Sequence, residues 1–385
     1  MNNISIIKEC SNCGACVCAC PMKAITVVED YYFKIKVNED KCVLCGKCLS
    51  TCPIDNLKAG NEPCKAIGGW ANQKDVREKS SSGGVFSLLA EYVLSREGVV
   101  FGARYAEDCR KIVFDSTDYV SLDALRRSKY VESDTGESFI QVQNHLKSGR
   151  LVLFCGTPCQ VAGLSSFLGK QYDNLILCDF ACGGLPSHKI FSDYIEELEE
   201  RYKAKVVSVN FRPKVSGWSR HHILIRFANG IQYSRLAMCD PFFYSFVYGR
   251  VSIRENCYDC KFSNNHYSDI TLADYWKYAD TPEIVNDEKG ISLVIANTIK
   301  GKVAVEKILD KMQYYELDLQ KASYNFKNTV RSEQIVTDRK RFFSVLRTKG
   351  LTEAAKACGM LHGVKATIFL TKLKIGMVLS SWKRK

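Results

Sequence analysis

The feature that most limits what this chain can fold into is a cysteine motif that occurs twice near its N-terminus. Each copy has the spacing Cys-x2-Cys-x2-Cys-x3-Cys-Pro, and about thirty residues separate the two copies. This is the spacing of bacterial ferredoxins, in which the fourth cysteine of each run reaches the other cluster. We therefore predict two 4Fe–4S clusters, one held by Cys10, Cys13, Cys16 and Cys52 and the other by Cys42, Cys45, Cys48 and Cys20.

Zinc is the alternative for these cysteines, because structural zinc sites with four thiolate ligands also use Cys-x2-Cys pairs. Zinc does not account for the third cysteine of each run, for the Cys-Pro ends or for the duplication, so the clusters are the favoured interpretation. Cys18, the extra cysteine of the first run, is expected to pack and not to ligate. Residues 24–28 and 33–37 are predicted to pair as a hairpin.

Composition places the rest of the chain among ordinary globular proteins. Of the 385 residues, 46% are hydrophobic and 25% charged, which excludes disorder, collagen-like repeats and coiled coil as the main organisation. The 19 cysteines are clustered, and we see no secretory signal and no uninterrupted apolar run of membrane-spanning length. A reducing cytoplasm is therefore expected.

The length fits two or three domains. We expect a dicluster ferredoxin domain at residues 1–60, a linker at 61–78 containing Gly68 and Gly69, a larger domain at 79–320 and a basic helical region at 321–385. A helix is predicted within the larger domain at 301–320.

The excess positive charge lies at the C-terminal end. Residues 321–385 carry 15 Lys or Arg and 3 Asp or Glu, whereas the other 320 residues carry 39 of each. This tail, predicted to be helical around residues 351–361, suits peripheral contact with an anionic membrane, an acidic partner such as a ferredoxin, or simple packing as a solvated helix. No recognition motif accompanies the charge, so nucleic acid is not an expected partner.

Two turns rich in small residues precede predicted helices in the body of the chain. Their backbone N–H groups and hydroxyls suit a phosphate, although ordinary helix N-caps would have the same composition. The first turn precedes a helix at 85–94 and a strand at 99–105, and consists of Lys79, Ser80, Ser81, Ser82, Gly83 and Gly84. The second precedes a helix at 139–146 and consists of Thr135, Gly136, Glu137 and Ser138.

Four further cysteines predict a third 4Fe–4S cluster. Cys159 and Cys182 follow apolar segments that are predicted as strands, at 151–154 and 175–177, with a helix at 161–168 between them. Such alternation is typical of an α/β layer that binds ligands at the C-terminal ends of its strands. Cys257 and Cys260 form a Cys-x2-Cys pair, which alone would equally suit half of a zinc site or a redox pair. Together the four thiols complete one cluster site.

The remaining segments indicate a mixed α+β and α/β fold. Residues 206–211 and 223–227 are predicted as antiparallel strands, and residues 270–273 as a further strand. Cys155 and Cys178 end apolar strands and are expected to be buried packing residues.

The order of these motifs resembles the coenzyme F420 hydrogenase/dehydrogenase beta-subunit family with an N-terminal ferredoxin module. The resemblance rests on the duplicated cysteine motif, the Lys79–Gly84 turn, Gly156-Thr-Pro-Cys159-Gln160, Cys182-Gly-Gly-Leu-Pro-Ser187, Cys257-x2-Cys260 and Asp269-Ile-Thr-Leu-Ala-Asp274-Tyr-Trp. It implies an FAD in the larger domain, one further 4Fe–4S cluster, and electron exchange with a deazaflavin or similar carrier. It also implies that the two turns contact the flavin.

This chain departs from the family at two places. It has Cys182-Gly183-Gly184 where members often have Cys-His-Gly, and Ala273-Asp274-Tyr275-Trp276 where they have Gly-Asp-Phe-Trp. The family also includes chlorophyll-type ring reductases, so the resemblance leaves the electron acceptor open.

These observations predict an iron–sulfur flavoprotein oxidoreductase subunit that moves electrons between a small two-electron carrier and one-electron clusters. Expected partners are that carrier and a redox protein, such as an acidic ferredoxin or a hydrogenase or dehydrogenase subunit. The alternatives are an electron-transfer subunit without flavin and a zinc-stabilised interaction scaffold. No catalytic residue is assigned. The candidates by type are His188, His221, His222 and His266, most of them expected at the surface, and the aromatic candidates for flanking a flavin ring, at least two of them expected in the core, are Trp218, Trp276, Tyr130 and Tyr275.

Overall fold

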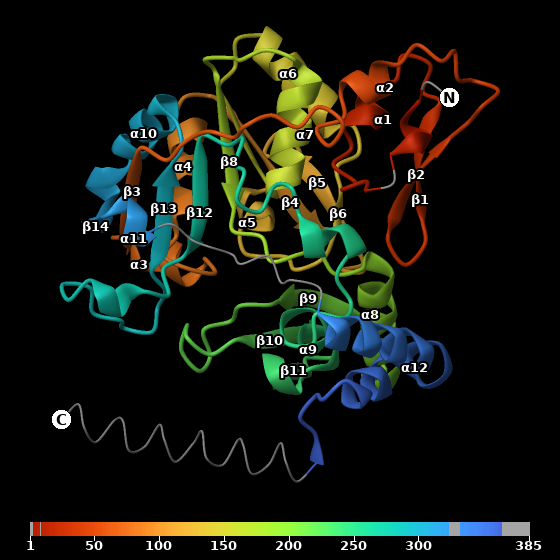
Figure 1. The fold of residues 1–385 in the computed structure, drawn as a ribbon. Coiled ribbons are helices and arrows are strands. Elements are labelled where there is room, and N and C mark those ends of the chain that lie inside the picture. The colour runs from red at the N-terminus through yellow and green to blue at the C-terminus, as the bar shows by residue number, and fades with distance from the viewer. Residues whose placement is uncertain (1–2, 8, 323–331, 364–385) are drawn as a thin grey trace.

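The computed structural model describes residues 3–7, 9–322 and 332–363. At its centre is a nine-stranded sheet with the strand order β14-β3-β13-β12-β8-β7-β4-β5-β6 (Figure 1). Strands β12, β8, β7 and β4 are mutually parallel, whereas β13, β3, β14 and β5 join antiparallel. The strands are β3 (Lys65–Ala71), β4 (Val99–Tyr105), β5 (Ile112–Ser116), β6 (Ser133–Asp134), β7 (Val152–Gly156), β8 (Leu175–Phe180), β12 (Ile270–Asp274), β13 (Ser292–Ala296) and β14 (Met312–Leu317).

Helices cover both faces of this sheet because its apolar side chains alternate between the faces. Along β7, Leu153 packs with α4 and α10, whereas Val152 and Phe154 pack with α6 and α7. The helices of this part are α3 (Lys74–Glu78), α4 (Val85–Leu94), α5 (Leu122–Leu125), α6 (Ser138–Lys147), α7 (Pro158–Leu168), α10 (Ile299–Glu306) and α11 (Leu319–Ala322).

A smaller lobe lies beside the C-terminal ends of the parallel strands. Its three-stranded antiparallel sheet, in the order β11-β10-β9, packs with three helices around a core rich in phenylalanine, including Phe191, Phe211 and Phe342. The elements are β9 (Val206–Asn210), β10 (His222–Phe227), β11 (Gln232–Leu236), α8 (His188–Tyr202), α9 (Pro241–Val247) and α12 (Glu333–Ala357), the last with a break at Gly350.

The N-terminal region is built from a hairpin and two short helices at one side of the molecule (Figure 1). Strands β1 (Ile25–Glu29) and β2 (Phe33–Val37) pair antiparallel, and each cysteine run contains one helix, α1 (Ala15–Ala19) or α2 (Lys47–Ser50). Its core is small and includes Cys16, Cys48 and Cys52 themselves. Cysteine side chains therefore take the place that larger apolar residues fill elsewhere.

The predicted elements are largely confirmed, but the linker at 61–78 is wrong. Within these residues, β3 pairs with both β13 and β14 inside the central sheet. Gly68 and Gly69 favoured the interpretation of this stretch as a flexible linker. In the structure, neighbouring residues approach both positions too closely for a side chain. A Cβ on Gly69 would lie 2.3 Å from the backbone oxygen of Gln313, and one on Gly68 would lie 3.0 Å from the Tyr275 ring.

The helix predicted at 301–320 is also wrong. Only α10 is helical, and the chain then forms β14, whose residues pair with β3 along its length. A helix is present before residue 357, where α12 ends, and it packs into the smaller lobe through Phe342 and Leu351. Residues 364–385, which carry much of the predicted basic tail, lie outside the described residues. Within the described part of the chain, no helix has the length and apolarity needed to cross a membrane.

Candidate redox site

The first predicted cysteine set is brought together across the N-terminal region. Burial raises the pKa of the Cys10, Cys13 and Cys16 thiols, and nearby thiols raise it further: Cys52 acts on Cys10 and Cys16, and Cys10 acts on Cys13 and Cys16. Four thiols that disfavour one another's ionised form are unfavourable as free thiolates. A bound cation or cationic cluster reverses this, because it needs deprotonated ligands.

The second set surrounds a small hollow near the surface. Cys20, Cys42, Cys45 and Cys48 all line it, beside Gly46 at the start of α2. Cys45 is exposed, and the neighbouring Val43 and Leu44 are exposed apolar residues. The grouping is the one expected from the crossed ferredoxin pattern, in which Cys20 joins the later run.

The third set comes from three separate parts of the larger domain. Cys159 lies in the first turn of α7, Cys182 follows β8, Cys257 lies in a short 3-10 helix, Glu255–Asp259, and Cys260 directly follows that helix. Burial, together with the neighbouring Cys260, raises the pKa of Cys159 to about 12 and of Cys257 to about 11. Burial and the three other thiols together raise the pKa of Cys182. The topology therefore joins four thiols that are up to about a hundred residues apart in sequence.

The first and third sets lie next to each other. The Cys13 thiol is within electrostatic range of Cys159, and a Cβ on Gly163 of α7 would lie 2.8 Å from the Cys13 sulfur. The side-chain amide of Asn256 donates to the backbone oxygen of Cys10 over 2.6 Å. Within the described residues, no three Cys, His, Asp or Glu side chains converge as a ready-made site for a single metal ion.

A cavity of about 410 Å³ lies beside the third set, at the C-terminal ends of the parallel strands. This is the edge at which open α/β sheets bind ligands. Residues 155–157 at the end of β7, residues 180–185 at and after the end of β8, and residues 272–274 of β12 form part of its walls. Cys182 belongs both to this wall and to the third cysteine set.

The first small-residue turn lies at this cavity. Ser80, Ser81, Ser82 and Gly84 line it, whereas Lys79 and Gly83 are not among the lining residues. Gly84 has φ +100°, a left-handed conformation that glycine adopts easily, and it starts α4. The Ser81 hydroxyl accepts a bond from the Ser128 N–H over 2.9 Å.

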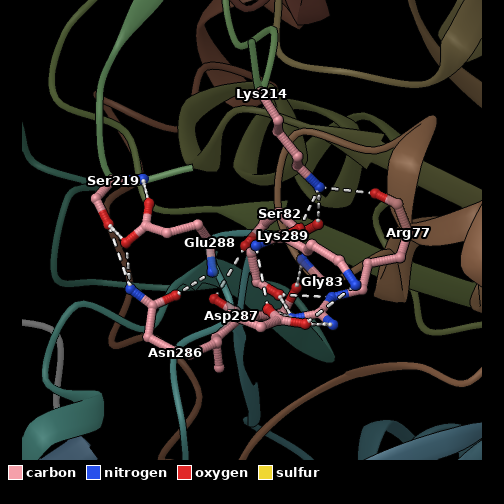
Figure 2. A network of polar contacts seen from close by, with 12 residues as sticks. Arg77, Ser82, Gly83, Lys214, Ser219, Asn286, Asp287, Glu288 and Lys289 are labelled. Atoms are coloured by element: carbon pink, nitrogen blue, oxygen red, sulfur yellow. Dashed lines mark hydrogen bonds and ion pairs between the residues drawn. The ribbon is translucent and has the colours of Figure 1, made fainter. Parts of the chain in front are cut away.

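A polar network holds this turn from behind (Figure 2). The Lys214 ammonium donates to the backbone oxygens of Arg77 and Ser82, over 2.7 and 2.9 Å, and to that of Lys289. The buried Arg77 guanidinium makes two bonds to the Asp287 carboxylate, over 2.8 and 2.7 Å. Burial, together with the nearby positive charges of Arg77 and Arg212, lowers the pKa of Lys214 to about 7. The turn is therefore fixed by loops that lie more than a hundred residues later in the chain.

The size and lining of the cavity suit a flavin nucleotide. Its volume is within the usual range of ligand pockets, roughly 300–1,000 Å³, and its lining combines apolar and aromatic residues with a serine-rich turn. Positive side chains suit a diphosphate, and the basic residues of the lining are Arg126, Arg127, Lys129, Arg212 and Arg250. Part of this charge is already compensated: Arg212 pairs with Asp274 of the same lining, Arg126 pairs with two carboxylates, and burial lowers the pKa of Lys129 to about 7.

The second small-residue turn faces the N-terminal region instead. Thr135, Gly136, Glu137 and Ser138 are not among the cavity-lining residues. The backbone oxygen of Gly136 accepts a bond from the Cys18 thiol over 3.3 Å, and the Thr135 hydroxyl donates to the Cys13 backbone oxygen over 3.5 Å. The structure places this turn against α1, where its small residues allow a close approach. Cys18 packs there, as predicted.

The aromatic candidates divide into two pairs. Tyr130 and Trp276 line the cavity, whereas Trp218 and Tyr275 are buried in the core, with the Trp218 ring stacked on Trp276 at 4.3 Å.

Most of the four histidines were expected at the surface, but His188 is buried and the other three are half-buried. His221 lines the cavity, and burial lowers its pKa to about 4. His222 is half-buried, in β10. Burial opposes the charged form of His266, but its 2.8 Å bond to buried Asp179 outweighs this and raises its pKa.

Sequence reasoning missed a buried ionic cluster between the N-terminal region and the body. Glu132 accepts bonds from the Phe33 N–H, the Arg254 guanidinium and the His188 ring, over 3.1, 2.6 and 2.6 Å. The His188 ring stacks on Phe33 at 3.9 Å, and Arg254 also donates to the Phe33 backbone oxygen. These residues come from four distant segments without a shared motif. The one signal in the sequence was that Arg254 lies three residues before the predicted ligand Cys257.

Together, the cysteine sets and the cavity beside them define an iron–sulfur electron-transfer protein. Comparison with known families supports this class: residues 9–56 match the 4Fe-4S dicluster domain. Residues 149–322 match the family described as the C terminus of the beta subunit of coenzyme F420 hydrogenase/dehydrogenase. The chain is thus similar to this family of oxidoreductase subunits over residues 149–322, and to the dicluster domain over residues 9–56.

Among solved structures, the chain is similar to a chain of the F420-reducing NiFe hydrogenase complex from Methanosarcina barkeri. The two share 14% identity at a TM-score of 0.47, over 74% of this chain and 94% of that chain. No curated protein matches this chain.

Proposed function

We propose that this chain is an iron–sulfur flavoprotein subunit that passes electrons between a small two-electron carrier and three 4Fe–4S clusters. The observation that carries the proposal is the shared wall: the turn that contains Cys182 belongs both to the third thiol set and to the 410 Å³ cavity. A flavin supplies the exchange between two-electron and one-electron chemistry. The family suggests a deazaflavin or similar carrier.

Each thiol set has a place in this proposal. Cys42, Cys45, Cys48 and Cys20 would hold the cluster nearest the surface, beside exposed Val43 and Leu44. The next sites inward are formed by Cys10, Cys13, Cys16 and Cys52, and then by Cys159, Cys182, Cys257 and Cys260. The sites thus follow one another from the surface of the N-terminal region to the cavity.

The chain's own residues would orient and retain the flavin. The Lys214 and Arg77 network fixes the serine-rich turn in place before any ligand arrives, which lowers the ordering cost of binding. The positive side chains of the cavity would attract the diphosphate, and Tyr130 and Trp276 offer flat faces to a ring system. His221 stays neutral at pH 7 and can donate or accept one hydrogen bond there.

The domain division follows from the same contacts. We propose a ferredoxin domain at residues 1–60 and a flavin- and cluster-binding body that begins with β3 at Lys65, not at residue 79. The body continues through β14, up to about residue 320. We also propose that the protein works in the cytoplasm with a partner redox subunit or ferredoxin, because all 19 cysteines are free thiols and the dicluster domain is an electron-transfer module.

The direct test is to purify the full chain anaerobically and to measure iron, sulfide and flavin in the same sample. We expect about twelve irons and one FAD per chain. About eight irons without flavin would support an electron-transfer subunit with an inactive body. Zinc in place of iron and sulfide would support the scaffold alternative.

A matched pair of variants tests which turn holds the flavin. Ser81→Asp keeps an acceptor for the Ser128 N–H but places a negative charge in the cavity, so retained flavin should fall to a small fraction of the wild-type level. Glu137→Ala changes the second turn at an exposed carboxylate and should keep the full amount. Flavin released on denaturation is measured by fluorescence. Equal retention in both variants would remove the first turn from the site.

A further inference from the structure

Two cysteines that no cluster uses lie side by side at the cavity. Cys155 of β7 and Cys178 of β8 are register partners in a parallel strand pair. Paired residues project to the same face of a sheet, and both side chains accordingly pack with the core under α4. Cys155 is half-buried and lines the cavity, whereas Cys178 is fully buried.

The two thiols are close enough to react with each other. The Cys155 thiol beside it, with burial next, raises the pKa of Cys178, whose thiol donates to the backbone oxygen of Asp179. Adjacent strands lie about 4.7–4.9 Å apart, which is within the Cα separations of about 4.4–6.8 Å that disulfides tolerate. A disulfide here needs little backbone movement.

Cys155 is the member of the pair that a small molecule in the cavity can reach. It lines the cavity beside Arg127 and Lys129. Cationic neighbours and partial exposure are typical of reactive cysteines, because the thiolate is the attacking form. An accessible attacking thiol with a buried second thiol behind it is the arrangement that thiol–disulfide exchange requires.

We propose that Cys155 and Cys178 form a redox-active thiol pair that reduces small disulfides entering the cavity. The Cys155 thiolate attacks one sulfur of the disulfide, so that a mixed disulfide forms and one thiolate leaves. Cys178 then attacks the Cys155 sulfur, the internal disulfide forms and the second thiolate leaves. The two protons of the protein thiols end on the two released thiols, and the protein loses two electrons to the disulfide.

The internal disulfide would be easy to reduce again. A Cβ separation close to the strand spacing is wider than the usual 3.5–4.5 Å, and strained disulfides are more readily reduced. The proposal goes beyond the proposed function. The entering disulfide would take space in the cavity that a flavin would fill, so the exchange is expected of chains whose cavity holds no flavin, and it uses only the two thiols and the disulfide.

The test is to measure flavin in the anaerobically purified full chain and remove any that is bound, to expose the protein to oxidised glutathione, to block free thiols, and to map disulfides by mass spectrometry. Cys155 and Cys159 share one tryptic peptide, 151–170, and Cys178 and Cys182 share another, 171–189. Fragment ions must therefore assign the cross-link. We expect a Cys155–Cys178 disulfide while the iron content stays unchanged.

Two variants separate the roles of the thiols. Cys178→Ser should accumulate a stable glutathione adduct on Cys155, and Cys155→Ser should leave Cys178 as a free thiol. Cys109→Ser, at a buried cysteine outside this pair, should behave as wild type. The proposal is overturned if the wild type carries only the glutathione adduct, if neither thiol reacts, or if the cross-link appears only after iron is lost. Iron and flavin contents measured on the same sample show independently whether the cluster and flavin assignments hold.

Discussion

The N-terminal region and the central body solve the same problem, placing four thiols around a cluster, in opposite ways. In the N-terminal region the ligands lie a few residues apart, and their side chains make up part of a small core. In the body, Cys159, Cys182 and Cys257 are held at the ends of strands and helices of a large sheet whose apolar core does not involve them. The first region should depend on its clusters for folding, whereas the second should form its thiol site by folding.

Removing the clusters is expected to have the largest effect. After anaerobic chelation of iron, residues 9–56 should lose amide-exchange protection down to the level of an unfolded chain, because little apolar core remains without the metal. Amides in β7, β8 and β12 should keep most of their protection. Exchange is measured by mass spectrometry on the chelated and untreated protein. A uniform loss across both regions would show that the body also depends on its cluster.

Breaking the third set should remove one cluster and leave the other two. Cys257→Ser is expected to lower the iron content by about four atoms per chain, with the low-potential signal of the ferredoxin clusters unchanged. Cys18→Ser is the matched control, because this thiol bonds the Gly136 backbone oxygen, belongs to none of the three thiol sets and should leave the iron content as it is. Iron and sulfide analysis with electron paramagnetic resonance distinguishes the results. Unchanged iron in Cys257→Ser would contradict the third-cluster assignment.

Breaking the ionic cluster around Glu132, which the N-terminal region and the body share, should lower the free energy of unfolding. Glu132→Ala leaves the buried Arg254 without its carboxylate, which we expect to cost about 3–5 kcal/mol in free energy of unfolding. Lys34→Ala removes a solvent-exposed pair with Asp30 and should leave the free energy of unfolding nearly unchanged. Denaturant unfolding measures both. A Glu132 effect as small as that of Lys34 would mean that the regions are held together mainly by apolar packing.

The smallest effect concerns pH at the cavity. Below about pH 7 the Lys214 ammonium has three protons for the backbone oxygens it bonds, and above that value the neutral amine has two. Flavin affinity should therefore weaken between about pH 6 and 8.5. The global effect has the opposite sign: since the pKa is depressed in the folded state, the unfolded chain binds the extra proton, and this group's contribution to stability rises between about pH 7 and 10.5. Fluorescence titration and denaturant unfolding check the two signs, and Lys214→Met should abolish both dependences.

The two regions also differ in how much of their structure could be predicted from the sequence. The duplicated cysteine motif predicted the dicluster region because its ligands are local, and β1, β2, α4 and β4 were located from residue pattern alone. The sequence did not show that Gly68 and Gly69 lie in a strand of the central sheet, because they are small to make room for Gln313 and Tyr275, which are distant in the chain. It also gave no sign that Thr135 and Gly136 contact the N-terminal region, since a small-residue turn suits a phosphate and an approaching helix equally.

Gly163 has a consequence for the speed at which the molecule can work. Under the proposed assignment, this glycine lies where the first and third cluster sites meet, and a methyl group there would collide with the Cys13 sulfur. Electron tunnelling falls off exponentially with the gap between donor and acceptor, so a side chain that pushes α1 away from α7 slows the transfer even when both clusters are intact. The absence of a single methyl group at this position therefore acts on the rate of turnover as well as on packing.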